Sequence, residues 1–380
     1  MIILFARYVL SCCVLVVVAD MQSVRAASEP HAVFTEAATV SNVDISYDDW
    51  SYILSATVFE AGRSDRSYAP PPVPGVGRRI VKGNTSSTRF EGNRLYFVGF
   101  DDENLKAVMR IRAELAAMPD AVPMAEWTKN QQLAYWLNLY NVTLISELAK
   151  RYPEQELRSL LYGKRGLLDR KLLKVAGVKL SLNDIHHRII LANWDDPLVI
   201  YGMFHGYVGC ASIRSEAYTA DKVWSQLKDN AFEFINSNRG ARMRGEVLEV
   251  SALYKENAEL FPDEASLRSH IADYADPVFA ARVHGASRIK ADVKDYYIAD
   301  LFQGVVNDTN PNEGSPAVFA AASGEAQIFF DAKGQQLRSL KAPIVAMEYL
   351  SKIREKKAAR EGQVSVEEFE APKEEAQPEQ

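Results

Sequence analysis

The chain is organised around residues 184–218, DIHHRIILANWDDPLVIYGMFHGYVGCASIRSEAY. This stretch holds three of the six histidines and the only cysteine that lies outside the first fifteen residues. It predicts a helix carrying His186 and His187, a turn at Asp195-Asp196-Pro197, a buried strand over 198–204, and a glycine-containing loop that ends at Cys210. Because adjacent residues of an α-helix point about 100° apart, we expect the two histidines to face different sides.

A thiol on a glycine-rich loop near imidazoles is a candidate nucleophile, because a neighbouring imidazole can lower its pKa. Cys210 would then be the nucleophile, with His187 as the first candidate base and His205 as the second. Three further side chains are candidates for orienting the base: Asn138, Asn141 and Asp196. The chemistry would be acyl transfer or amide hydrolysis. The competing interpretation is that Cys210 is a buried small hydrophobic residue and that both asparagines tie the core together.

A metal site is a third interpretation of the same residues. His187, His205 and Cys210 with a carboxylate can be drawn as a zinc site, but no paired CxxC or HExxH motif supports it. The sequence therefore predicts neither a metal nor another cofactor.

The strongest predicted helix lies in EWTKNQQLAYWLNLYNVTLISELAKRYP, residues 126–153. Apolar residues recur there at three- and four-residue spacing, Thr128 is a good N-cap, and Pro153 marks the stop. Further helices are expected over 43–58, 101–117, 216–238 and 340–359, and a hairpin over 88–100. We predict a mainly helical α+β fold, with a small sheet from segments near 94–100, 175–182, 198–204 and 246–250.

The two ends of the chain predict its domain organisation. Residues 1–26 have the charged start, the short apolar run and the Val24-Arg25-Ala26 site of a cleaved signal peptide. A flexible leader (27–43), a main domain (44–306), a C-terminal extension (307–360) and a disordered acidic tail (361–380) follow. We therefore expect an exported protein, periplasmic or extracellular, with no membrane span after cleavage and a single remaining cysteine.

The net charge of −6 is local to the tail. Residues 361–380 hold seven glutamates and one lysine, a balance of −6. The remainder of the chain is therefore near neutral, which argues against nucleic acid as a partner.

Four motifs together resemble the domain of unknown function named DUF547. They are the QLAYWLNLYNVTLI helix, SLNDIHHRIIL, the Asp196-Pro197 turn, and the cysteine loop followed by Tyr218. The resemblance covers roughly residues 44–302 and implies a domain found in exported bacterial proteins and in plant proteins, not a particular reaction. The positions that match the family pattern are Asn138, Tyr140, Asn141, His187, Asp196, Pro197, Cys210 and Tyr218.

Several positions depart from the pattern of that family. His186 replaces the acid of its IEH motif, Leu198 replaces the Arg of DPR, and His205 stands where a second cysteine is frequent. Ala211-Ser212 replaces two prolines after the cysteine. These departures favour a non-catalytic envelope module that binds a peptide, an amide or a protein, with a cysteine-dependent acyl transferase or amide hydrolase as the alternative.

Overall fold

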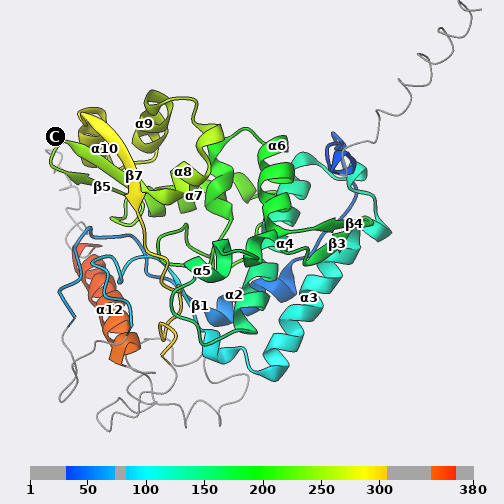
Figure 1. Ribbon diagram of the computed structural model, residues 1–380, viewed down its shortest axis with the longest axis horizontal. Helices are drawn as coiled ribbons and strands as arrows, with labels where there is room; N and C mark the ends of the chain where they lie inside the picture. Colours follow the sequence, from blue (N-terminus) through cyan, green and yellow to red (C-terminus); the bar gives the residue numbers. More distant parts are fainter. Residues whose placement is uncertain (1–30, 73–82, 306–343, 365–380) are drawn as a thin grey trace, which may run out of the picture.

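The structure is a computed structural model that describes residues 31–72, 83–305 and 344–364. It confirms a mainly helical α+β fold with small sheets (Figure 1). The α-helices are α2 (Asp48–Thr57), α3 (Asp102–Ala121), α4 (Lys129–Ala149), α5 (Arg158–Tyr162), α6 (Leu191–Asn193), α7 (Val223–Ile235), α8 (Ala252–Glu256), α9 (Glu264–Asp273), α10 (Pro277–His284) and α12 (Ile344–Val364). The strands are β1 (Val58–Phe59), β2 (Arg94–Leu95), β3 (Leu173–Val175), β4 (Val178–Leu180), β5 (Ala241–Arg244), β6 (Val247–Ser251) and β7 (Arg288–Val293).

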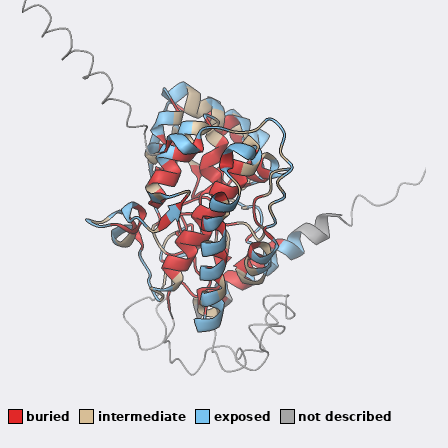
Figure 2. Ribbon diagram, turned by 90° about the vertical axis from the view of Figure 1, so that its right-hand side faces the viewer, coloured by how far each residue is buried: buried red, intermediate tan, exposed pale blue. Residues whose placement is uncertain are grey.

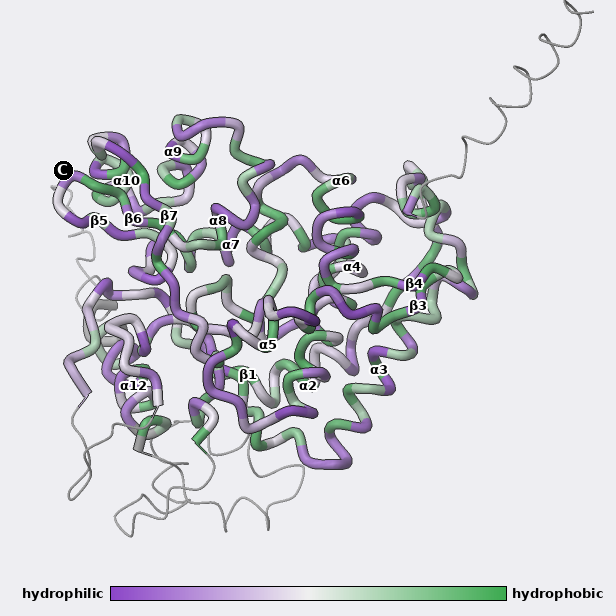
Figure 3. Tube along the Cα trace, in the orientation of Figure 1, coloured by the Kyte–Doolittle hydropathy of each residue, from purple (hydrophilic) through white to green (hydrophobic). Residues whose placement is uncertain are grey.

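Helix α4 lies at the centre of the core. Its N-terminus is closed by the predicted cap, because the Thr128 hydroxyl accepts from the Gln131 amide and the Gln131 side chain accepts from the Thr128 amide. All residues from Gln132 to Leu148 are buried, so neighbouring elements surround the helix on every side (Figure 2). Helix α3 packs against it with one apolar face, and hydrophilic and hydrophobic residues alternate along the turns of α3 (Figure 3).

The β-structure forms three separate small sheets among the described residues, not one. β1 pairs with β2 and β3 pairs with β4, both antiparallel. β6 is the middle strand of the third sheet, antiparallel to β5 and parallel to β7. The extended segments predicted near 175–182 and 246–250 are confirmed, since they overlap β3–β4 and β6. The Ser251 hydroxyl accepts from the Leu253 amide and so caps α8.

The predicted strand at 198–204 is wrong, because Pro197–Gly202 forms the 3-10 helix η6. The Asp196 carboxylate accepts from the Leu198 amide at 2.9 Å, and Pro197 has a backbone angle suited to the first helical turn. An apolar run of this length does not by itself distinguish a buried strand from a buried helix. Here the local cap decided the outcome.

The predicted hairpin at 88–100 is also wrong. Arg94–Leu95 pairs with Val58–Phe59, and Phe97–Gly99 is the 3-10 helix η2. The Arg94 guanidinium instead holds the preceding loop, donating to the carbonyls of Arg89, Glu91, Gly92 and Asn93. A long-range strand partner and a buried cation therefore replace the expected local turn.

The helix predicted over 216–238 begins later, at Val223. Residues 216–222 are occupied by loop contacts instead. The Asn138 side chain holds the backbone of Tyr218, and the Gln226 side chain accepts from the Thr219 amide. These long-range hydrogen bonds keep residues 216–222 out of the helix that their apolar spacing predicts.

An extended segment, residues 295–301, joins parts of the chain that are distant in sequence. On one side it exchanges backbone hydrogen bonds with residues 155–157, and on the other with residues 206–209. At its C-terminal end, the Ala299 carbonyl accepts from the Leu95 amide, and the Leu301 amide donates to the Leu95 carbonyl. This segment, which follows β7, therefore holds the start of α5 and the cysteine loop next to each other.

The C-terminal helix α12 was predicted over 340–359 and is observed at Ile344–Val364. It packs on a second apolar cluster that contains Phe59, Tyr96 and Phe302. The Tyr349 hydroxyl donates to the Gly92 carbonyl at 2.9 Å, and its ring lies beside the Arg94 guanidinium. Part of the C-terminal extension is therefore docked on the main core.

Several predictions concern residues outside the described part of the chain. They are the signal peptide at 1–26, the first four residues of the leader (27–30), the first part of the extension, and the acidic tail beyond residue 364. Within the described residues, no helix is long and apolar enough to span a membrane.

Candidate functional site

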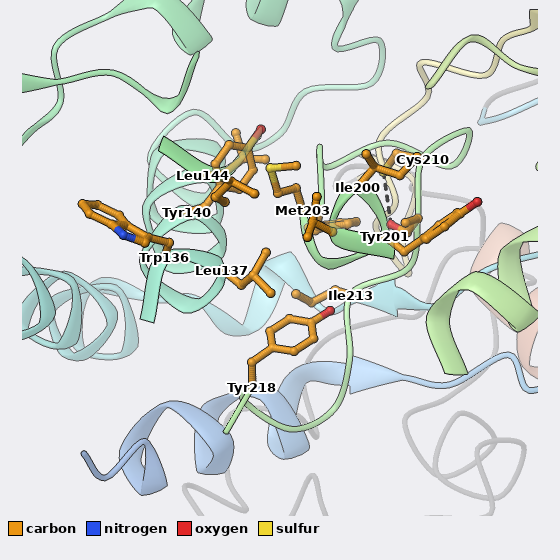
Figure 4. Packing of buried hydrophobic residues seen from close by; sticks show 14 of the residues in the cluster. Trp136, Leu137, Tyr140, Leu144, Ile200, Tyr201, Met203, Cys210, Ile213 and Tyr218 are labelled. Carbon is orange, nitrogen blue, oxygen red and sulfur yellow. Dashed lines mark hydrogen bonds between the residues drawn. The ribbon is translucent and has the colours of Figure 1, made fainter. Parts of the chain in front are cut away.

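The predicted nucleophile, Cys210, lies inside the core. Its side chain is 1% exposed, and it packs beside Ile200 in the apolar cluster that also holds Tyr140 and Met203 (Figure 4). The thiol donates to the Tyr207 carbonyl at 2.9 Å, and its sulfur accepts from the His205 backbone amide at 3.4 Å. Its hydrogen-bond partners in the described structure are therefore backbone groups and not imidazole nitrogens.

The electrostatics of Cys210 oppose a thiolate. Burial raises the pKa of its thiol to about 11, although the backbone hydrogen bonds and the Arg239 cation partly offset that effect. The Arg239 guanidinium donates to the Cys210 carbonyl and pairs with Glu233, so its charge is already balanced. A thiol with this pKa is protonated at neutral pH and is a poor nucleophile.

Two glycines set the shape of the cysteine loop. Gly206 has φ +85°, and a Cβ there would lie 2.5 Å from the Leu148 side chain. A Cβ on Gly209 would lie 2.9 Å from the backbone nitrogen of Asp295. The glycines predicted to mark a reactive loop instead allow close packing against α4 and the 295–301 segment.

The two candidate asparagines bridge α4 to the neighbouring backbone. Asn138 donates to the Tyr218 carbonyl and accepts from the Tyr218 amide, at 2.8 and 3.0 Å. Asn141 makes the same two-point contact with the Gly202 carbonyl and the Phe204 amide, both at 2.9 Å. Asp196 caps η6. In the described structure none of these three side chains orients a histidine through a hydrogen bond.

The histidine pair differs from what an α-helix predicts. Residues Asp184–Ile190 form the π-helix η5, and the rings of His186 and His187 stack with centroids 4.0 Å apart. The two rings therefore lie against each other, contrary to the expectation that they face different sides. His186 is buried and contacts the Asn257 side-chain oxygen at 2.6 Å, whereas the His187 side chain is 40% exposed and lies 3.1 Å from Glu259.

His205 is the third imidazole of the group. Its ring lies 5.8 Å from the His186 ring and 5.9 Å from the Tyr140 ring, and its side chain is buried. Burial, with a smaller contribution from His187, lowers the pKa of His205 to about 4. Burial also lowers the pKa of His186 strongly, so both inner imidazoles are neutral at physiological pH.

A carboxylate and three tyrosines, which sequence reasoning missed, lie next to these histidines. The Tyr162 hydroxyl donates to Glu256 Oε2 at 3.1 Å and lies 3.2 Å from the Tyr207 hydroxyl. The Tyr296 ring is 4.9 Å from the Tyr207 ring and 5.9 Å from the Tyr162 ring. We call Glu256, Tyr162, Tyr207 and Tyr296 the Glu256 cluster.

The sequence carries little signal for the Glu256 cluster. Tyr207 stands in the glycine loop three residues before the cysteine, which is the one local hint. Tyr162 and Tyr296 are brought together by the hydrogen bonds of the 295–301 segment, and Glu256 ends a helix without a recognisable motif. Only the pairing of distant segments places them side by side.

The predicted metal alternative has no counterpart in the described residues. No group of three or more histidine, cysteine, aspartate or glutamate side chains is placed there to hold a metal ion. Cys210 is free and buried, and its sulfur is used by backbone groups.

The fold and this site define a mainly helical α+β protein with a buried cysteine and a histidine–tyrosine–glutamate centre beside it. Residues 124–235 match the model of a family described as "Protein of unknown function, DUF547", so over this segment the chain is similar to that family. The matched segment contains α4, the π-helix, the cysteine loop and α7, whereas Glu256 and Tyr296 lie outside it. Comparison with curated proteins and with solved structures found no match.

Proposed function

We propose that this protein is a non-catalytic binding or interaction module of the cell envelope. The observation that carries the proposal is the state of Cys210, whose thiol is buried, held by backbone groups and shifted to a pKa of about 11. The departures of the chain from the motifs of its family support the same conclusion. The partner would be an envelope peptide, amide or protein.

The alternative, a cysteine-dependent acyl transferase or amide hydrolase, needs a thiolate and an imidazole in contact. His187, the first candidate base, is engaged with His186 and Glu259 instead. His205 contacts the Cys210 thiol through its backbone amide. The imidazole ring of His205 instead contacts the rings of Tyr140, His186 and Tyr207. A reaction at Cys210 would therefore require a rearranged loop.

Alkylation of Cys210 by iodoacetamide should be very slow in the folded protein from pH 6 to pH 9, because the thiol is both buried and protonated. Mass spectrometry of the peptide that contains Cys210 measures this rate without interference from Cys12 and Cys13. Added denaturant should make the modification rapid, and His187→Ala should leave the native rate unchanged. Rapid native alkylation below pH 7 that His187→Ala slows would establish the catalytic alternative.

The envelope location rests on the predicted signal peptide. We expect the protein recovered from its native host to begin near Ala27, after the Val24-Arg25-Ala26 site. Mass spectrometry of the N-terminal peptide measures this directly. Soluble protein that retains Met1 would contradict cleavage and export by this route.

A further inference from the structure

Glu256 is a half-buried carboxylate that forms no salt bridge among the described residues. It stands at the end of α8, and the salt bridges of the described structure do not include it. Burial raises its pKa, while hydrogen bonding from Tyr162 and Tyr296 and the nearby His187 and Lys294 partly offset this effect. Since buried carboxylates are normally paired with a cation or a metal, this group has capacity for a positively charged ligand.

The surroundings of Glu256 present hydrogen-bond acceptors and aromatic rings. The hydroxyl oxygens of Tyr162 and Tyr207 lie 3.2 Å apart next to the carboxylate. The Tyr296 ring has the Arg158 guanidinium 5.7 Å from its centroid, so a ring of this cluster already attracts a cation from the protein itself. These groups favour a cation over an anion.

One unpartnered polar atom lies deeper in the same neighbourhood. The Tyr140 hydroxyl is buried and has no hydrogen-bond partner within the described structure, whereas the buried His205 imidazole has the Met203 backbone as a hydrogen-bond partner. Their rings contact one another at 5.9 Å, and the His205 ring is 6.0 Å from the Tyr207 ring of the cluster. A buried polar atom without a partner, near a carboxylate that forms no salt bridge, is typical of a site that a polar ligand completes.

We propose that the Glu256 cluster is a binding site for a primary ammonium group. The proposal rests on the proposed function, because it names the ligand class of a non-catalytic module. A primary ammonium has three N–H donors, which the Glu256 carboxylate and the two tyrosine hydroxyl oxygens can accept. A quaternary ammonium lacks those donors, and the tyrosine rings contact one another instead of forming an open cage of ring faces.

The test is a titration of the full chain with n-butylammonium, followed by the NMR signals of ¹³C-labelled tyrosine rings and by calorimetry. 1-Butanol is the neutral probe of matched length. We expect saturable shifts with n-butylammonium alone, a loss of affinity of at least tenfold in Glu256→Gln, and a smaller loss in Tyr162→Phe. A parallel titration with Nα-acetyl-lysine methylamide distinguishes a protein lysine, which should bind more tightly than n-butylammonium, from a free amine.

Glu246→Gln is the matched control, since this exposed carboxylate lies between β5 and β6 and its loss should leave binding unchanged. Equal affinity in Glu256→Gln, or equal affinity for 1-butanol, would overturn the proposal. If Glu256→Gln does not fold, Tyr162→Phe carries the test, because it removes one oxygen and keeps the ring. If ammonium binding fails and Cys210 resists alkylation, only the ligand class is ruled out. If Cys210 is rapidly alkylated in the folded protein, the proposed non-catalytic function is ruled out.

Discussion

Replacing Trp136 by alanine should lower the free energy of unfolding by about 3–5 kcal/mol, which is a large share of the stability of an ordinary domain. Trp136 is fully buried on α4, and its ring has edge contacts with Phe34 and Tyr135, each at 5.0 Å between centroids. Alanine would leave a cavity that the tightly packed helix cannot close. Urea unfolding measures the loss.

Two controls separate burial from aromatic character. Trp136→Phe should cost less, because it keeps a ring in the site, and Tyr52→Ala should change stability little, since Tyr52 is 67% exposed on α2. A Trp136→Ala protein that unfolds at the wild-type urea concentration would show that α4 does not form the centre of the core.

Acid should unfold this protein well before its carboxylates are fully protonated. The pKa of His205 is about 4 in the folded protein, against about 6.5 in an unfolded chain. Because the unfolded state binds more protons between these values, stability is complete above pH 6.5 and falls as the pH drops toward 4. The shift of His205 alone corresponds to about 3 kcal/mol, and the lowered pKa values of His186 and His270 act in the same direction.

The measurement is the free energy of unfolding in urea at pH 7.5, 6, 5 and 4.5. His205→Phe should reduce the dependence of the unfolding free energy on pH, because this variant has one fewer buried imidazole that binds a proton on unfolding. His284→Gln is the control, since His284 is exposed at the end of α10 and should not change the slope. A stability that is constant from pH 7.5 to 4.5 would show that the inner histidines are not buried.

The elements whose ends are marked by local chemistry could be predicted from the sequence. Thr128, the predicted N-cap, forms with Gln131 the capping box that begins α4, and the segment predicted near 246–250 is strand β6. The 198–204 segment shows where this reasoning fails. Its apolar run fits a strand and a buried helix equally well, and Asp196 with Pro197 settles it as a 3-10 helix.

The candidate site divides in the same way. Residue types and spacing singled out Cys210, His187 and His205, which the structure does bring into one region. Spacing carries no information about solvent exposure, however, and exposure decides whether a thiol is reactive. The burial of Cys210 follows from how α4, η6 and the glycine loop pack together.

By itself the sequence determined the helical character of the chain, the presence of α4 and the family resemblance, because these depend on periodicity, caps and short motifs. Only the tertiary structure decided the stacking of His186 on His187, the burial of Cys210 and the assembly of the Glu256 cluster. Tyr162, Tyr207 and Tyr296 meet because the 295–301 segment forms hydrogen bonds with two distant parts of the backbone. Such pairings are set by the packing of the whole core, so no local pattern records them.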